Sequence, residues 1–138
     1  MESAIYINCD GGARGNPGPA ASAFVVKKEG KGIYKQQKYL GKTTNNVAEY
    51  QAVISALKWL TENKKIAGGA DIIFLLDSEL ITKQLMGIYK TKNPTLKKLF
   101  TSAKLLEQGL SNKIYYKRIP REKNMGADYL VNTVLRNY

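Results

Sequence analysis

The chain is predicted to fold as an α/β domain with a five-stranded mixed sheet flanked by helices. Three strand-like segments come first, at residues 4–10, 20–28 and 33–41, and the short connections between them predict an antiparallel meander. Helical and strand patterns then alternate, which predicts parallel pairing with a right-handed crossover. The length of 138 residues, without a repeat or a linker, predicts a single domain over residues 1–138.

Turn-forming and capping residues predict the connections in the first half. Residues 11–19 read Gly-Gly-Ala-Arg-Gly-Asn-Pro-Gly-Pro, a composition typical of a loop. Gly30-Lys31-Gly32 predicts a hairpin turn. Apolar side chains then recur with a helical period over residues 46–63, so this segment is predicted to be an amphipathic helix that starts at Thr44 or Asn45.

The second half is predicted to contain two strands and three helices. Residues 72–76 are all apolar, which is typical of a strand covered on both faces. Residues 78–87, 95–108 and 127–135 read as helices, and residues 113–119 as a strand. If the strand at 72–76 pairs with the first strand, the order of the sheet reverses there. Ligands bind beside such a switch point, at the carboxyl ends of the strands.

Four acidic residues lie at positions where a metal site could form: Asp10, Glu49, Asp77 and Asp128. Asp10 and Asp77 end the two strands that flank the switch point. Glu49 is expected in the first helical turn, half-buried, where the helix dipole favours an ionised carboxylate. Oxygen ligands without histidine or thiolate suit Mg²⁺ or Mn²⁺. The alternative is that each acid only ends a strand or caps a helix.

The composition favours a polyanionic partner. Lys and Arg number 22 against 11 acids, giving a net charge of +11, so nucleic acid is the expected partner and a solvated lysine-rich surface is the alternative. The absence of histidine excludes serine–histidine and cysteine–histidine catalysis, and the single Cys9 excludes an internal disulfide. No segment resembles a secretion signal or a membrane span, so we expect a cytoplasmic protein without a membrane partner. A monomer is the default expectation.

Four segments taken together resemble type 1 ribonuclease H. None is specific alone, but in order they cover almost the whole chain: Asp10-Gly11-Gly12-Ala13-Arg14-Gly15-Asn16-Pro17-Gly18-Pro19, Thr43-Thr44-Asn45-Asn46-Val47-Ala48-Glu49-Tyr50, Leu76-Asp77-Ser78, and Pro120-Arg121-Glu122-Lys123-Asn124 through Asp128 to Asn132. The resemblance implies a ribonuclease H-like fold and an endonuclease that cuts the RNA strand of RNA–DNA hybrids. It further implies two Mg²⁺ ions per site, with Mn²⁺ as a possible substitute, and 5′-phosphate and 3′-hydroxyl products.

The resemblance also implies roles for particular residues. The metal ligands correspond to Asp10, Glu49, Asp77 and Asp128. Contacts to the RNA strand correspond to the Gly12 backbone, Asn16, Asn45 and Asn46, while a pocket for a DNA-strand phosphate corresponds to Thr44 and Asn93 with Lys42 as a basic neighbour. For Asn45 and Asn46, helix capping is the alternative role.

Three features depart from the family pattern. Arg121 stands where many members carry a catalytic-loop histidine; arginine cannot act as a base but can hold a phosphate, and a solvated loop cation is the alternative. Glu79 stands at a substrate-binding position, where some members contact the RNA strand through a glutamine, and it adds negative charge near the expected site. The segment 84–99 lacks the long basic insertion of some members. Local substitutes are Lys90, Lys92, Lys97 and Lys98, which otherwise form a solvated helix face.

Two other functions remain open on the sequence. A non-catalytic nucleic-acid-binding module could keep the same fold. A nuclease could also accept broader substrates, including double-stranded RNA or branched DNA, because a fold does not fix a substrate.

Overall fold

The computed structural model describes residues 3–138 and contains one five-stranded sheet in the order β3-β2-β1-β4-β5. The strands are β1 (Ile5–Ala13), β2 (Gly18–Lys28), β3 (Lys31–Thr43), β4 (Ile72–Leu76) and β5 (Ile114–Arg118). β1, β2 and β3 are antiparallel, whereas β1, β4 and β5 are parallel to one another. The predicted mixed sheet, with its reversal between β1 and β4, is therefore confirmed.

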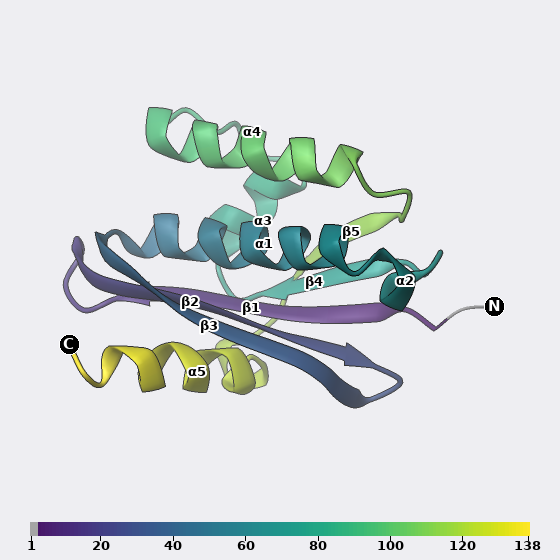
Figure 1. Ribbon diagram of the computed structural model, residues 1–138. Coiled ribbons are helices and arrows are strands. Elements are labelled where there is room, and N and C mark those ends of the chain that lie inside the picture. The colour runs from purple at the N-terminus through teal and green to yellow at the C-terminus, as the bar shows by residue number, and fades with distance from the viewer. Residues whose placement is uncertain (1–2) are drawn as a thin grey trace.

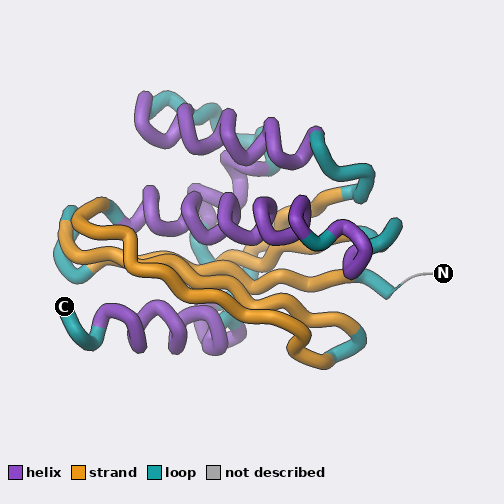
Figure 2. The backbone as a smooth tube through the Cα atoms, in the orientation of Figure 1, coloured by secondary structure: helices purple, strands orange, loops and turns teal. Residues whose placement is uncertain are grey.

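Helices cover both faces of this sheet (Figures 1 and 2). They are α1 (Asn45–Glu62), α2 (Lys64–Ala67), α3 (Glu79–Leu85), α4 (Pro94–Gln108) and α5 (Met125–Leu135), with a short 3₁₀ helix, η1, at Arg121–Lys123. Figure 1 shows α1 on one face with α4 stacked outside it, and α5 on the opposite face. The N-terminal ends of α1 and α4 lie at the same end of the molecule.

The glycine-rich segment is shorter as a loop than the sequence predicts. Strand pairing continues through Gly11, Gly12 and Ala13, which lie opposite Ser22, Ala21 and Ala20 of β2. The loop expected over 11–19 is thus reduced to residues 14–17. The prediction was wrong because small residues on both strands let two backbones pair where composition alone indicated a turn.

The β2–β3 hairpin and the edge strand differ in detail from the prediction. The turn is formed by Glu29 and Gly30, both with positive φ (53° and 77°), as a tight two-residue turn requires. The predicted turn at 30–32 was therefore placed one residue too late. β3 is solvent-exposed along most of its length, and its lysines discourage pairing with a second chain.

β4 is buried mainly on one face. Ile72, Phe74 and Leu76 are buried, while Ile73 and Leu75 are half-buried. The expectation of a strand covered on both faces was wrong, because α5 lies beneath β1, β2 and β3 rather than beneath β4. An unbroken apolar run does not by itself tell which face a helix will cover.

The helix starts follow local capping rules. The side chain of Thr44 accepts a hydrogen bond from the Val47 N–H, so Thr44 rather than Asn45 caps α1. Ser78 and Asn93 cap α3 and α4 in the same way. α2 and η1 were not predicted, because a single turn carries too few residues for a periodic pattern.

Two apolar clusters hold the layers together. The larger one joins α1, α3 and α4 to the sheet and includes Tyr50, Leu57, Phe74 and Leu85, all fully buried. The smaller one joins α5 to β2 through Ala21, Ala23, Leu130, Val131 and Leu135.

Gly11 is the point of closest approach between β1 and α1. A β-carbon at this position would overlap the backbone carbonyl of Ala48 and the backbone nitrogen of Glu49. Only glycine lets the strand and the helix approach this closely. This close approach places the C-terminal part of β1 against the segment of α1 that carries Glu49.

We expect Gly11→Ala to lower the free energy of unfolding by about 3 kcal/mol, because backbone atoms cannot move aside as a flexible side chain can. Gly12→Ala is the matched control, since a β-carbon there meets its nearest atoms at 3.8 Å. Chemical denaturation of both variants measures the difference. Equal stability of the two variants would contradict the close approach at Gly11.

Candidate active site

Three carboxylates converge at the carboxyl ends of the central strands. Asp10 lies near the end of β1, Asp77 directly follows β4, and Glu49 comes from α1. Each offers one oxygen, and these three oxygens lie within 4.8 Å of one another. We call Asp10, Glu49 and Asp77 the acidic cluster. The parallel pairing of β1 with β4 is what brings the two aspartates together, as the switch-point argument predicted.

Burial and mutual repulsion perturb this cluster strongly. Burial, followed by the charges of Asp77 and Asp128, raises the pKa of Asp10 from 3.8 to about 7. Burial, followed by the charges of Asp10 and Asp77, raises the pKa of Glu49 well above its usual range. Such perturbed carboxyl groups gathered beside a groove are typical of a functional site.

The environment of Glu49 differs from the sequence expectation. Its side chain is buried, with 6% exposed, rather than half-buried, and it lies beyond the first turn of α1. The helix dipole acts mainly within the first turn. Desolvation therefore dominates, and the pKa is raised instead of the ionised form being favoured.

Asp128 lies at the margin of the acidic cluster. It is half-buried in the first turn of α5, and its Oδ2 accepts a hydrogen bond from Asn132 at 3.2 Å. It lines a groove together with Asp10 and Arg121. The structure thus brings three of the four predicted carboxylates into one compact set and places the fourth beside them.

The acidic cluster fits a hard divalent cation. Its donors are all oxygens, the set that Mg²⁺ and Mn²⁺ prefer. Glu49 Oε2 is buried and has no hydrogen-bond partner within residues 3–138. A buried carboxylate oxygen left unpaired is costly, and a cation at this position would compensate it.

Asn124 organises the site and was not singled out from the sequence. It is fully buried at the end of η1. Its Nδ2 donates to the Cys9 carbonyl at 2.8 Å and to Asp77 Oδ2 at 3.1 Å, and its Oδ1 accepts from Asn8 at 3.0 Å. One side chain thereby links β1, the end of β4 and the start of α5. No local pattern indicates this role, because its partners lie far away in the chain.

A groove of about 460 Å³ opens beside the acidic cluster, and we call it the central groove. It is lined by Gly11, Asn45, Asn46, Glu49, Asp77, Ser78, Arg118 and Arg121. The predicted residues Asn46 and Arg121 thus lie next to the carboxylates. Arg118 was not predicted, although it is the last residue of β5 and lies opposite Leu76, the last residue of β4.

The asparagines near the glycine loop are linked to one another. Asn45 Oδ1 accepts a hydrogen bond from the Ala13 N–H at 2.8 Å, and Asn16 Oδ1 accepts one from the Asn45 N–H at 3.0 Å. Neither Asn45 nor Asn46 is the N-cap of α1, since Thr44 has that position. These contacts hold the glycine-rich loop against the start of α1.

The residues expected to bind a DNA-strand phosphate do not line the central groove. Thr44 and Asn93 are the N-caps of α1 and α4, whose N-terminal ends share one end of the molecule (Figure 1). Lys42 is exposed near the end of β3.

A second groove, of about 560 Å³, is lined by Lys90, Lys92 and Lys97 together with Tyr89 and Phe100, and we call it the lysine groove. Lys98 does not line it.

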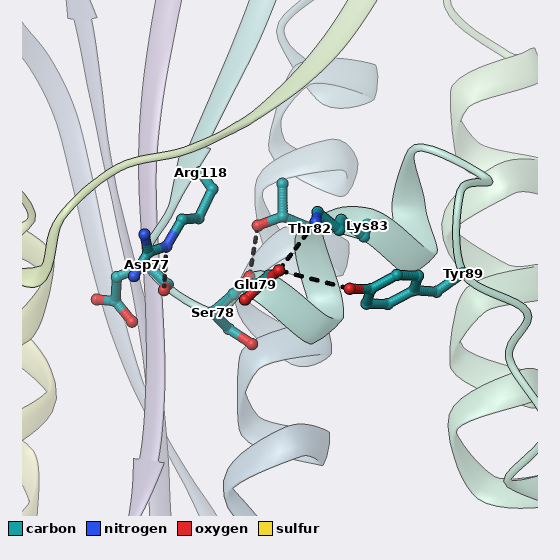
Figure 3. Close-up of polar contacts among 7 residues, drawn as sticks. All are labelled: Asp77, Ser78, Glu79, Thr82, Lys83, Tyr89 and Arg118. Atoms are coloured by element: carbon teal, nitrogen blue, oxygen red, sulfur yellow. Dashed lines mark hydrogen bonds and ion pairs between the residues drawn. The ribbon is translucent and has the colours of Figure 1, made fainter.

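Glu79 does not face the acidic cluster. Its carboxylate pairs with Lys83 at 2.8 Å and accepts a hydrogen bond from Tyr89 at 3.4 Å. Lys83 lowers the pKa of Glu79, as expected of an ion pair. Figure 3 shows the side chain of Glu79 directed toward Tyr89 while the carboxylate of Asp77 lies on the other side. The negative charge expected near the site is therefore turned away and neutralised.

The family model described as RNase H matches residues 2–133 of this chain. The chain belongs to the RNase H family. This membership confirms the resemblance carried by the four sequence segments.

Relatives and solved structures agree with this family. The chain is 35% identical over 133 residues to a bifunctional protein of Mycobacterium tuberculosis and 38% identical over 132 residues to ribonuclease HI of Halobacterium salinarum. Each alignment covers 95% of this chain. It covers only 35% of the Mycobacterium tuberculosis protein and 64% of the Halobacterium salinarum protein. The crystal structure of LC11-RNase H1 in complex with an RNA/DNA hybrid is 43% identical and superposes with a TM-score of 0.89, covering 94% of both chains. RNase H1 of Halobacterium salinarum is 35% identical, with a TM-score of 0.88 and coverage of 97% of this chain and 98% of that one.

Among residues 3–138, no helix is both long and apolar enough to cross a membrane.

We expect Asn124→Ala to lower the free energy of unfolding by about 2–4 kcal/mol, because it leaves Asn8 and the Cys9 carbonyl buried without partners. It also frees Asp77 Oδ2, so the affinity for Mg²⁺ should fall by roughly tenfold. Denaturant unfolding and calorimetric titration with Mg²⁺ measure the two effects. The exposed Asn137→Ala is the control, and unchanged Mg²⁺ affinity in Asn124→Ala would contradict the link to Asp77.

We expect the metal-free protein to lose stability as the pH rises toward about 7. The folded protein retains a proton on Asp10 that the unfolded chain releases near 3.8, so this contribution is full below 3.8 and is lost as the pH passes about 7. Asp10→Asn should therefore raise the melting temperature of the metal-free protein at about pH 8 by roughly 3–6 °C. Differential scanning calorimetry in EDTA measures this, with the exposed Asp71→Asn as control. A lower melting temperature for Asp10→Asn would show that burial and repulsion of the Asp10 carboxylate do not destabilise the metal-free protein.

Proposed function

We propose that this protein is an endonuclease that hydrolyses the RNA strand of RNA–DNA hybrids. The observation that carries the proposal is the acidic cluster, which lies at the switch point of an RNase H fold and opens on the central groove. A net charge of +11 supplies attraction to a polyanion despite this local negative charge. The hybrid in the LC11-RNase H1 complex supports the same substrate class.

The metal ligands in this proposal are Asp10, Glu49, Asp77 and Asp128. Two divalent ions, Mg²⁺ or Mn²⁺, would supply the positive charge that activates a water molecule and stabilises the departing 3′ oxygen, giving 5′-phosphate and 3′-hydroxyl ends. Asp10 interacts with Glu49, Asp77 and Asp128, so it would hold the metal charge together with each of the other three carboxylates. Asn124 fixes the position of Asp77 through its hydrogen bond to Oδ2.

Selection of the RNA strand is assigned to the polar groups on one side of the central groove. Asn46 lines the groove, and an asparagine amide can both donate to and accept from a 2′-hydroxyl. The Oδ1 atoms of Asn45 and Asn16 are engaged in holding the loop, which leaves their amide N–H groups for the substrate. The Gly12 backbone offers close approach to the same strand.

The DNA strand is assigned to the helix starts and to neighbouring lysines. Thr44 and Asn93 cap two helices whose N-terminal ends favour a phosphate, and Lys42 adds charge nearby. The lysine groove provides Lys90, Lys92 and Lys97 for further backbone contacts. Glu79 is paired with Lys83, so we assign it no direct substrate contact.

The protein is proposed to act as a cytoplasmic monomer.

Arg121 is assigned to phosphate binding rather than to proton transfer. It lines the central groove and the adjoining groove beside Asp128. A guanidinium remains protonated at all relevant pH values, so it can hold a phosphate oxygen but cannot accept a proton.

Asp77→Asn should abolish cleavage while leaving hybrid binding intact, because it removes a metal ligand and adds no bulk. The measurement uses a labelled RNA–DNA hybrid with Mg²⁺ or Mn²⁺, beside duplex RNA, duplex DNA and single-stranded RNA. Asp71→Asn is the matched control, an exposed aspartate at the other end of β4. Normal turnover by Asp77→Asn would refute the metal-site assignment. Binding of the hybrid by the wild type without any cutting would support a binding module instead, and cutting of duplex RNA would broaden the substrate class.

Arg121→Ala should lower kcat by less than about tenfold, since a single exposed charge–phosphate contact contributes about 1 kcal/mol. Steady-state kinetics on the same hybrid measure this, with the exposed Arg136→Ala as control. Complete loss of activity would instead make Arg121 a central catalytic residue.

A further inference from the structure

Arg118 stands beside the acidic cluster without belonging to it. It ends β5 and lies opposite Leu76, the residue before Asp77. Its Nε donates to the backbone carbonyl of Asp77 at 3.3 Å, and Figure 3 shows its guanidinium next to that residue. The contact goes to the backbone, so the carboxylate of Asp77 remains directed toward Asp10 and Glu49.

Among the described residues, Arg118 forms no ion pair with an acid, although its charge contributes to lowering the pKa of Glu79, which is itself paired with Lys83. Within residues 3–138, the ion pairs are Lys83–Glu79 and Lys104–Glu107, and neither involves Arg118. Its side chain is exposed and lines the central groove together with Asn45 and Asn46. An arginine that lines an acidic groove and pairs with none of its carboxylates is available to an anion from outside.

The guanidinium is oriented for such an anion. Arginine carries five N–H donors in a planar fork that matches two oxygens of a phosphate. The Nε donor is engaged by the Asp77 carbonyl, which fixes the plane of the group. The four donors of the two terminal amino groups remain for a ligand.

We propose that Arg118 binds a phosphate of the strand that is cut, next to the phosphate that reacts. This inference rests on the proposed function and adds a phosphate contact to it. The reacting phosphate must lie at the carboxylates of the acidic cluster, whereas Arg118 contacts the backbone of Asp77. Its neighbours in the central groove, Asn45 and Asn46, are the residues assigned to the RNA strand. Arg118 therefore acts in positioning that strand.

Lys117 provides a matched control. It is exposed, precedes Arg118 in β5 and pairs with Leu75. Because neighbouring residues of a strand point to opposite faces, its side chain lies on the other face of the sheet. Lys117→Ala and Arg118→Ala remove the same charge from adjacent positions, so any difference between them reports on location.

The first experiment measures hybrid binding in EDTA, which prevents cutting, by fluorescence anisotropy over a range of salt concentrations. Arg118→Ala should weaken binding by roughly tenfold and reduce the slope of log K against log salt by about 0.9. Arg118→Lys should keep the salt slope and recover part of the affinity. Binding by Arg118→Ala that matches binding by Lys117→Ala would overturn the inference.

The second experiment locates the phosphate. A series of hybrids carries one uncharged methylphosphonate linkage at successive positions of the strand that is cut. At one position near the cleavage site, the uncharged linkage should weaken binding by the wild type. The same linkage should not weaken binding by Arg118→Ala any further, because that variant already lacks the contact. Identical profiles for the two proteins would refute the contact, and a shared position on the DNA strand instead would refute its assignment to the cut strand.

The proposed nuclease function and the role of Arg118 can be refuted separately. If the wild type binds the hybrid but does not cut it with Mg²⁺ or Mn²⁺, the proposed nuclease function fails while the binding comparison still tests Arg118. If the wild type cuts the hybrid and Arg118→Ala binds it unchanged, the function stands and only the inference about Arg118 fails.

Discussion

The parallel pairing of β1 with β4 is the constraint on which the rest of the site depends. It runs from Ile5 opposite Ile72 to Asn8 opposite Leu75, and therefore brings Asp10 and Asp77 to the same edge of the sheet. Gly11 then lets α1 approach close enough to add Glu49, and Asn124 ties the end of β4 to β1. A slip of one residue in this register would turn one of the two aspartates to the opposite face.

The electrostatic arrangement separates opposite charges instead of pairing them at the site. The carboxylates of the acidic cluster are crowded and largely buried, and within the described residues none of them forms an ion pair with a lysine or arginine. The cations Arg118 and Arg121 line the central groove, and further cations line the lysine groove. Internal ion pairs would occupy the groups that a cation and a phosphate backbone need.

Much of this arrangement could be predicted because its signals are local. The helical period of the apolar residues predicted α1, and the apolar run at residues 72–76 predicted β4 with its observed bounds. Thr44, the observed N-cap of α1, was one of the two predicted helix starts, with Asn45 as the other. The four acids stood out because each lies at the end of a strand or near the start of a helix. The extent of β1 was missed, since Gly11 and Gly12 indicate a turn locally but pair with small residues of β2 in the sheet.

The sequence by itself determined the fold class, the family resemblance and the chemical type of the site, because periodicity, capping and residue identity act over a few neighbouring residues. Only the tertiary structure decided how deeply Glu49 is buried, which acids converge, that Glu79 turns toward Lys83, and that Asn124 and Arg118 contact Asp77. These properties depend on groups as far apart as Cys9 and Asn124, which meet only when the chain has packed. Desolvation and contact across such separations leave no periodic trace in the sequence.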